Sequence, residues 1–268
     1  VHPWLPKNFI NKDSFKKLFG FGSNLMISGV LNITFIHIYK IIIGKLYSST
    51  LLGFYDQALN LKNVVSESFI SSMAKVFYPT LSKVKEDQER LKAAYIKIMK
   101  ATSYVIFPTM AGLGLVAKPF LLTIAGDQWV GAIPILQILV FSGAIYHLHL
   151  LNLDILKILN RTDLILRLEI YKKIGVIAAI IIGLQFGFYG LVIAQVISSY
   201  VSLYINMTYT AKLLQYTRWQ QFADNFSGFL ISVPMILVVF AVDFVEIDLI
   251  PLKLFVLVSI GIVVYVGT

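Results

Sequence analysis

Polar and charged side chains recur every three or four positions through one otherwise apolar stretch, residues 52–80. They are Asp56, Asn60, Asn63, Glu67, Ser71 and Lys75. In a helix this spacing places them along one side. A charge at the centre of a bilayer costs about 2.5–3.5 kcal/mol, so such groups face water or other protein groups. The stripe therefore predicts either the wall of a hydrated cavity or a packed helix contact in which Lys62 or Lys40 neutralises Glu67.

Two other apolar stretches carry weaker stripes of the same spacing. Residues 18–44 contain Asn24, Ser28 and Asn32, and residues 187–212 contain Gln195, Ser199, Ser202 and Asn206. Together the stripes would enclose one polar cavity. Small polar residues at helical spacing more often form packing surfaces, however, and we favour that interpretation for these two helices. The candidate cavity residues are Asn32, Lys40, Asn60, Lys62, Asn63, Glu67, Ser71, Gln195, Ser199 and Asn206.

The sequence offers little to other kinds of chemistry. It has no cysteine, and no Gly-rich loop with a lysine for nucleotide phosphates. His147 and His149 point to roughly opposite faces of a helix and so cannot share a metal ion, and we expect His149 with Asn152 to be an interhelical hydrogen-bonding pair. The reactive groups of an enzyme converge near a substrate surface, and no such group of residues is evident. We therefore expect no enzyme activity, no metal and no cofactor.

The composition and the lengths of the apolar runs indicate an integral membrane protein. Hydrophobic residues make up 57% of the 268 residues and charged residues only 14%, and the mean hydropathy is +0.78. Runs near the roughly 20 residues that cross a bilayer repeat along the chain. They predict an all-α, polytopic membrane helix bundle of about eight transmembrane helices. The expected ranges are 18–44, 52–80, 97–117, 131–158, 163–184, 187–212, 225–244 and 252–268, of which the second is the least certain.

Lysine and arginine residues gather at alternate junctions between these helices. They precede residue 18 and lie around residues 81–100, 157–173 and 212–218, whereas the intervening junctions carry few. The positive-inside rule then places both the amino terminus and Thr268 on the cytoplasmic side. The formal charge of +9 is explained by topology and by contact with anionic membrane lipids, and not by nucleic acid. We expect the charged segment 82–100 to lie along the cytoplasmic interface as an amphipathic helix, with a solvated loop as the alternative.

Three runs of the sequence resemble a known family of transporters. They are LFGFGSNLMISGVLNITFIHIYKIIIGKLYSSTLLGFYDQA, FYPTLSKVKEDQERLKAAYIKIMKATSYVIFPTMAGL and PILQILVFSGAIYHLHLLNLDILKILNRTDLILRLEIYKKIG. They are similar to the second half of bacterial Wzx-like polysaccharide and O-antigen flippases, which belong to the multidrug/oligosaccharidyl-lipid/polysaccharide exporter superfamily. The resemblance is specific for the family but not for the sugar.

The resemblance implies one half of a two-bundle transporter fold. Two six-helix bundles would surround a central cavity, followed by two further helices. Residues 1–17 would form the cytoplasmic linker between bundles, residues 18–215 the six-helix carboxy-terminal bundle, and residues 216–268 the two additional, truncated helices. The missing amino-terminal bundle of the same protein would be a partner of this chain.

The same resemblance implies a function in the bacterial inner membrane. The protein would flip undecaprenyl-diphosphate-linked oligosaccharide for O-antigen, capsule or exopolysaccharide synthesis. Lys40, Lys62 and Lys75 would balance the diphosphate, and the Asn, Gln and Ser faces would bind the sugar. Lys75 lies near a helix end, where a lysine more often extends its side chain so that the ammonium reaches the membrane interface. Two alternatives are a cation-coupled drug or metabolite exporter of the same superfamily and a non-transporting membrane scaffold.

Overall fold

Helices dominate the computed structural model, which describes residues 12–245, 247 and 249–268 and contains no strand within them. The long helices are α1 (Lys12–Leu46), α2 (Ser49–Lys83), α3 (Gln88–Leu115), α7 (Thr162–Leu184), α8 (Gly187–Leu213), α9 (Arg218–Asp243) and α10 (Ile250–Gly267). The shorter elements are α4 (Ala117–Ala125), the 3₁₀ helix η1 (Asp127–Ala132), α5 (Ile133–Ala144) and α6 (Tyr146–Ile158). Most of the predicted linker, residues 1–17, lies outside the described residues.

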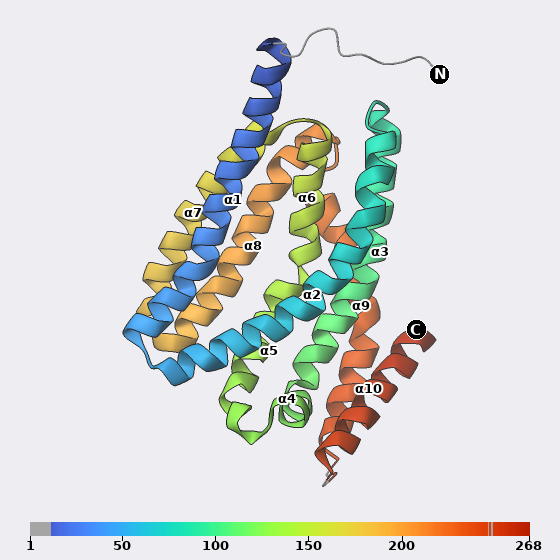
Figure 1. Cartoon of the computed structure of the whole chain (residues 1–268). Helices are drawn as coiled ribbons and strands as arrows, with labels where there is room; N and C mark the ends of the chain where they lie inside the picture. The colour runs from blue at the N-terminus through green and yellow to red at the C-terminus, as the bar shows by residue number, and fades with distance from the viewer. Residues whose placement is uncertain (1–11, 246, 248) are drawn as a thin grey trace, which may run out of the picture.

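The chain runs back and forth along one direction, as Figure 1 shows. Its passes are α1, α2, α3, α5 with α6, α7, α8, α9 and α10, which correspond to the predicted ranges. Within the described residues, 5 helices are long and apolar enough to cross a membrane, and the bent pair α3 and α4 makes up to 6. The helices α2 and α7 do not meet that test, because charged residues interrupt both. The structure therefore confirms the all-helical membrane bundle, with approximately the expected number of spans.

The charged segment 82–100 joins two long helices, α2 and α3. Its larger part opens α3, which begins at Gln88 behind an Asp87 cap and continues without interruption to Leu115. Side chains on this part hold the turn between α8 and α9: Gln88 Nε2 donates to the Leu213 carbonyl at 3.0 Å. Lys100 Nζ lies 2.8 Å from Asp224 Oδ1 on α9. The segment therefore forms a helix with Leu91 and Ile98 buried beneath its charged face, as predicted, and its position along the membrane interface stays a prediction.

One predicted span ends in a sharp bend, and another is divided into two helices. The chain bends by 72° between α3 and the short helix α4. The predicted helix 131–158 is divided at Ile145 into α5 and α6. Gly126, which ends α4, has a φ of 88°, a conformation that glycine adopts without steric cost. These breaks place α4 and η1 at the end of the bundle opposite the start of α1 (Figure 1).

The helices form two groups joined by α5 and α6. One group packs α1 and α8 against α7, and the other packs α3 and α10 against α9, while α2 contacts α3, α5 and α6. The helix α2 has 35 residues, which at about 1.5 Å per residue span about 52 Å. This exceeds the hydrocarbon thickness of about 30 Å, so the helix must tilt. It runs diagonally across the bundle in Figure 1.

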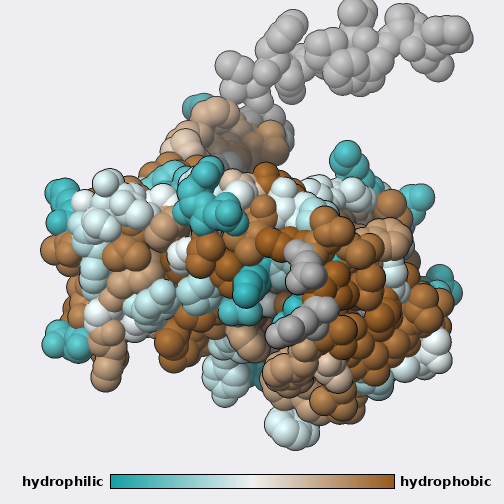
Figure 2. Space-filling model, turned by 90° about the horizontal axis from the view of Figure 1, so that it is seen from below, coloured by the Kyte–Doolittle hydropathy of each residue, from teal (hydrophilic) through white to brown (hydrophobic). Residues whose placement is uncertain are grey.

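Most of the surface is apolar. Seen from below the view of Figure 1, hydrophobic side chains cover much of the molecule, and hydrophilic ones form small separate patches (Figure 2). Many large apolar residues are exposed, among them Ile33, Phe141 and Val263. In water such a surface would drive aggregation, whereas lipid covers it at no cost. The chain is therefore a multi-pass membrane protein.

Candidate functional site

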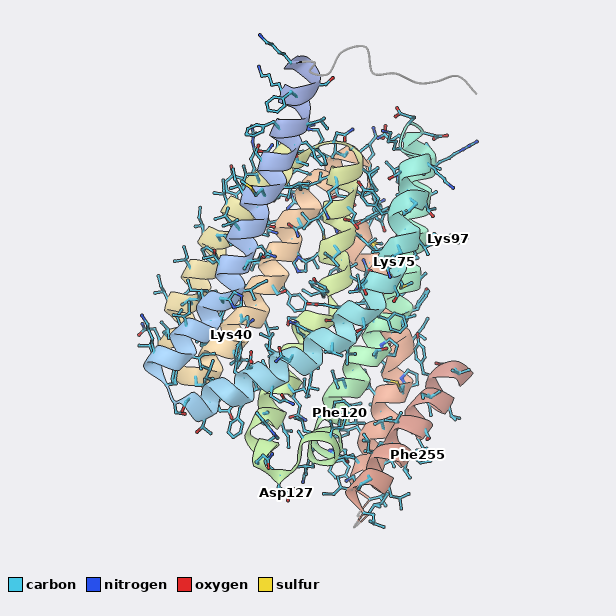
Figure 3. All side chains as sticks on the ribbon, viewed as in Figure 1. Lys40, Lys75, Lys97, Phe120, Asp127 and Phe255 are labelled. Atoms are coloured by element: carbon cyan, nitrogen blue, oxygen red, sulfur yellow. The ribbon has the colours of Figure 1, made fainter. Side chains whose placement is uncertain are left out.

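The polar stripe of α2 faces away from the bundle that this chain builds. Asn60, Glu67 and Ser71 are exposed, as is Lys75, and Asn63 is half-buried. The other side of α2 is buried against the rest of the chain through residues that include Tyr55, Ala58, Leu59, Ser66 and Ile70. Figure 3 shows Lys75 toward the far end of α2 and Lys40 near the beginning of that helix. The stripe thus forms a continuous row of polar side chains along α2 on an otherwise apolar surface.

The charged residues of this face do not form the ion pair that the sequence suggested, in which Lys40 or Lys62 would neutralise Glu67. Lys40 of α1 forms an ion pair with Asp56 of α2, and both side chains are partly exposed. Among the residues that the structure describes, no cation lies within ion-pair distance of Glu67. The ion pair ties the end of α1 to the beginning of α2, while the exposed Glu67 carboxyl has no hydrogen bond or ion pair within the described part of the chain.

Lys62 lies on the buried side of α2, not on the stripe. Its side chain is only 9% exposed, and its stem passes Gly143 of α5, where a Cβ would come within 3.1 Å of Lys62 Cδ. No carboxylate lies within ion-pair distance of its ammonium in the described part of the chain. A buried cation without a partner is unfavourable in a membrane and commonly marks a functional position.

A charged cluster on α7 is a feature that the sequence analysis did not identify. Glu169 contacts the ammonium groups of both Lys172 and Lys173, the latter at 3.4 Å. Lys173 Nζ also donates to Asn32 Oδ1 of α1 at 3.2 Å and lies 5.2 Å from the centre of the Phe35 ring. The spacing of three and four residues was a usable signal, because it brings opposite charges together on one helix face. Asn32 is thereby placed on the α1–α7 contact.

The stripe of α8 faces the interior, in agreement with the packing interpretation. Tyr55 Oη donates to Gln195 Oε1 at 3.0 Å. The buried Asn206 lies with its Nδ2 3.0 Å from Nδ1 of His149, and Ser199 Oγ lies 3.4 Å from Nε2 of the same ring. These contacts join α8 to α2 and α6, so the α8 residues support the site from within.

The two histidines lie on opposite sides of α6, as predicted, and His149 hydrogen-bonds to another helix, α8, as expected, whereas the side chain of Asn152 does not. Asn152 donates instead to the Leu148 carbonyl at 2.8 Å, within its own helix. His147 Nε2 lies 2.8 Å from Ser103 Oγ of α3, which in turn donates to Asn225 of α9. The residues of this polar cluster are buried. Its contacts hold α3, α6 and α9 together.

An apolar groove lies beside α2 on the surface between α3, α9 and α10. It has a volume of about 430 Å³, and its lining includes Val65, Pro108, Val239 and Gly261. No charged side chain contributes to it. Because Val65 belongs to α2, the groove reaches the helix that carries the polar stripe. The groove and the stripe lie on different sides of α2, because Val65 is two residues from both Asn63 and Glu67 and so points to roughly the opposite face of the helix.

The chain is similar to several known proteins, and one of these matches covers its whole length. Residues 1–134 match the model of a family described as polysaccharide biosynthesis protein. The chain is 26% identical over 280 residues to an uncharacterized membrane protein in the cps region of Klebsiella pneumoniae, covering 100% of the chain and 55% of that protein. It is 23% identical over 230 residues to the lipopolysaccharide biosynthesis protein WzxC of Escherichia coli, covering 84% of the chain and 46% of the relative.

A solved structure has the same fold. It is the lipid II flippase MurJ in an inward closed conformation, with a TM-score of 0.75 and 16% identity, and the match covers 98% of this chain and 55% of MurJ. The chain therefore spans about half the length of the relatives that it matches.

Proposed function

Because this chain belongs to the polysaccharide biosynthesis protein family, we propose that it supplies the carboxy-terminal half of a transporter that flips a lipid-linked oligosaccharide across the bacterial inner membrane. The polar face of α2 is the observation that carries this proposal. Lipid cannot hydrogen-bond Asn60, Glu67 and Ser71, so water, a substrate or a second protein surface must cover them. Sugar hydroxyls and a diphosphate are chemically matched to such a face.

The substrate has a polar and an apolar part, and the structure offers a surface for each. The polar stripe would contact the sugar. The positive charge of Lys62, which is buried behind the stripe, would attract the diphosphate through the protein without touching it. The groove between α3, α9 and α10, which includes Val65 of α2, would hold the isoprenoid tail. The carbon–oxygen and phosphate bonds of the substrate stay intact in such a process, so we propose transport without catalysis of a reaction and without a cofactor.

The amino-terminal bundle would cover the α2 face from the opposite side. We propose the division into a linker at residues 1–17, a six-helix bundle at residues 18–215 and two additional helices at residues 216–268. A site at the interface of two repeated bundles is a common design of transporters, and rocking of one bundle against the other would open it to each side in turn. With the lysine-rich junctions in the cytoplasm, both ends of this chain would lie on that side.

Complementation tests the proposal directly. The chain, joined to an amino-terminal six-helix bundle of the family, should restore surface polysaccharide in a bacterium that lacks its own flippase. Glu67→Leu should insert normally yet lower surface polysaccharide, because it removes the outward carboxyl from the stripe. Glu89→Leu is the matched control, since Glu89 is an exposed glutamate in the first turn of α3, away from the stripe. No restoration by correctly inserted protein, or equal effects of the two substitutions, would count against the proposal.

The exposed carboxyl of Glu67 also suits the second candidate, a cation-coupled exporter of the same superfamily. A carboxyl that gains and loses a cation during transport would need access to water, and Glu67 is exposed on the surface of this chain. In that case Glu67→Leu would uncouple export from the ion gradient, and surface polysaccharide would not change. The third candidate, a scaffold, predicts that cysteines introduced at Asn60 or Ser71 do not react with water-soluble reagents. The absence of native cysteine makes that measurement direct.

A further inference from the structure

Helices α8 and α9 leave an open seam between them on the membrane-facing surface. The chain turns between the two helices at residues 214–217, but α8 packs mainly against α7 and α9 mainly against α3 and α10. A cavity of about 580 Å³ lies in the seam near the turn, lined by Tyr200, Leu203, Tyr204, Met207, Arg218, Trp219 and Phe222. A second cavity of about 430 Å³ lies deeper and shares Tyr200 with the first. We call the two cavities together the α8–α9 seam.

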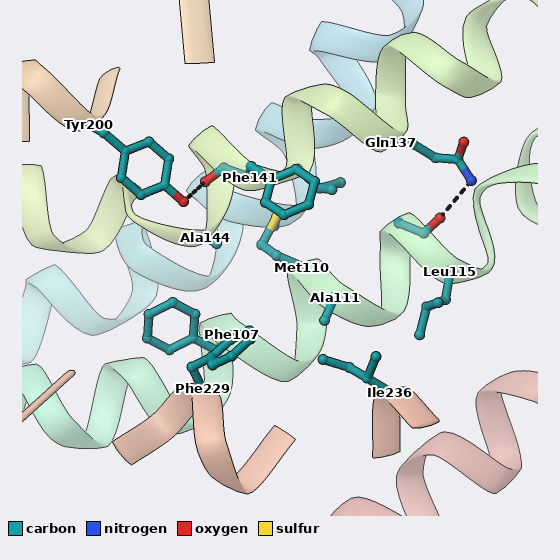
Figure 4. Close-up of a pocket in the computed structure, with 12 residues that line it drawn as sticks. Phe107, Met110, Ala111, Leu115, Gln137, Phe141, Ala144, Tyr200, Phe229 and Ile236 are labelled. Atoms are coloured by element: carbon teal, nitrogen blue, oxygen red, sulfur yellow. Dashed lines mark hydrogen bonds between the residues drawn. The ribbon is translucent and has the colours of Figure 1, made fainter. Parts of the chain in front are cut away.

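The deeper cavity is almost entirely apolar. Figure 4 shows Phe107, Met110, Phe229 and Ile236 around it, with Tyr200 at one side. The two hydrogen bonds drawn there are internal to the protein, since Tyr200 Oη donates to the Phe141 carbonyl and Gln137 Nε2 to that of Gly114. Polar groups at its edge are thus already satisfied. A hydrocarbon chain fits this lining.

An aromatic ladder follows α9 from the turn to the deeper cavity. Ring centroids are 6.1 Å apart between Trp219 and Phe222, 6.3 Å between Phe222 and Phe226, and 5.6 Å between Phe226 and Phe229. These side chains are 40–76% exposed. From Trp219 to Phe229 the helix rises about 15 Å at about 1.5 Å per residue. That is about the depth of one leaflet in a hydrocarbon core of about 30 Å.

A cation without a carboxylate partner stands at the shallow end of the seam. The guanidinium of Arg218 lies over the Tyr204 ring, 4.3 Å from its centre, and no carboxylate lies within ion-pair distance of it in the part of the chain that the structure describes. The nearest acidic residue along α9, Asp224, is already held by Lys100 and Tyr216. Stacking on the tyrosine fixes the guanidinium while its N–H groups stay free to bind a phosphate. Trp219 beside it is the residue type that anchors at a membrane interface.

From these features we propose that the α8–α9 seam binds one anionic phospholipid, with its phosphate on Arg218 and an acyl chain along the aromatic ladder. The site differs from the groove proposed for the isoprenoid tail. That groove touches α2 and has no charged residue in its lining. The seam has a cation, touches no residue of α2, and is one leaflet deep, which suits an acyl chain better than a long polyisoprenoid. The proposal does not depend on transport.

Tryptophan fluorescence tests the proposal, because Trp219 lies in the seam itself. The purified protein, with Trp4 and Trp129 replaced by phenylalanine, is placed in phosphatidylcholine vesicles that contain chain-brominated phosphatidylglycerol or chain-brominated phosphatidylcholine as a quencher. One basic residue near the bilayer attracts an anionic lipid by about 1 kcal/mol, so brominated phosphatidylglycerol should be enriched at Trp219 by about fivefold over the neutral lipid. The quenching at equal mole fraction should differ accordingly.

Two substitutions separate a specific site from general attraction to the membrane. Arg218→Gln should bring the two lipids close to equal quenching, whereas Lys45→Gln, at an exposed lysine in the last turn of α1, should leave the preference unchanged. Phe226→Trp in a Trp219→Phe background moves the reporter along the ladder and should show the same preference. Equal quenching by both lipids in the parent protein would overturn the proposal. Quenching by neither lipid would also overturn it and would indicate that a second copy of the chain covers the seam. Displacement of the phospholipid by an undecaprenyl phosphate would overturn it as well.

Discussion

Replacing Lys62 by methionine should stabilise the protein and lower its transport at the same time. A lysine at the centre of a membrane helix costs about 2.5–3.5 kcal/mol on insertion scales. Lys62 is 9% exposed, has no ion-pair partner among the described residues, and its stem already fills the space beside Gly143. Methionine retains that packing without the charge, so we expect a gain of about 2 kcal/mol, somewhat below the full cost. For a chain of this size that corresponds to a rise in Tm of about 4–8 °C.

Lys40→Met is the control that separates charge from position. Lys40 is ion-paired with Asp56, so its loss leaves a carboxylate without its cation. Because both groups are partly exposed, the destabilisation should stay below about 1 kcal/mol, and its sign should be opposite to that of Lys62→Met. Thermal unfolding of the detergent-solubilised protein measures stability, and surface polysaccharide in the complemented host measures transport. A lower Tm for Lys62→Met would refute the inference that its ammonium is unpaired, and unchanged transport would refute its role with the substrate.

Three further substitutions test the packing that holds the site. Gly143→Val should lower the Tm, because a Cβ at this position would come within 2.7 Å of Met110 Sδ. Overpacking of this kind costs about 1–3 kcal/mol of stability. An unchanged Tm would show that the methionine side chain moves aside freely. Gly183→Leu should separate α7 from α8, because its Cβ would meet that of Ala194 at 2.7 Å, and protease resistance of the α7–α8 hairpin reports this. His149→Phe should lower the free energy of unfolding by about 1–3 kcal/mol, and with it the Tm, because it leaves polar partners on α8 unsatisfied. A milder effect of His149→Gln would support the hydrogen-bonding role, and equal effects of the two substitutions would contradict it.

The positions of the helices could be predicted from the sequence because the apolar runs end at polar residues or turns. The interruptions could not. Ile145 lies within a continuous apolar run, so only packing against the other helices decides that α5 ends and α6 begins there. Some signals for the bend after α3 were present, however. Pro119 stands near the beginning of α4 and Gly126 at its end, and both are common where helices start or stop.

The direction in which each stripe faces was only partly predictable. Helical spacing places Gln195 and Asn206 on one face of α8 as surely as it places Asn60 and Glu67 on one face of α2. The difference lies in what surrounds each face. Buried partners, such as His149 for Asn206, bind the α8 stripe. Among the described residues, the α2 stripe has only the Lys40–Asp56 ion pair with another helix. Periodicity determines which residues share a face but not what the face contacts.

The two helices that are too polar for the membrane-span test meet their electrostatic cost in different ways. In α7 the charges are balanced internally, since Glu169 contacts both Lys172 and Lys173, and α1 covers part of the cluster through Asn32. In α2 the Glu67 carboxyl and the Lys62 ammonium have no such partners within the described chain. The bilayer cannot supply them. Stability of α2 in the membrane therefore requires polar groups or water from outside this chain, which the proposed amino-terminal bundle and its cavity would provide. Reagent-accessible cysteines at Asn60 and Ser71 in the joined protein, and their burial when substrate accumulates, are the observations that this requirement predicts.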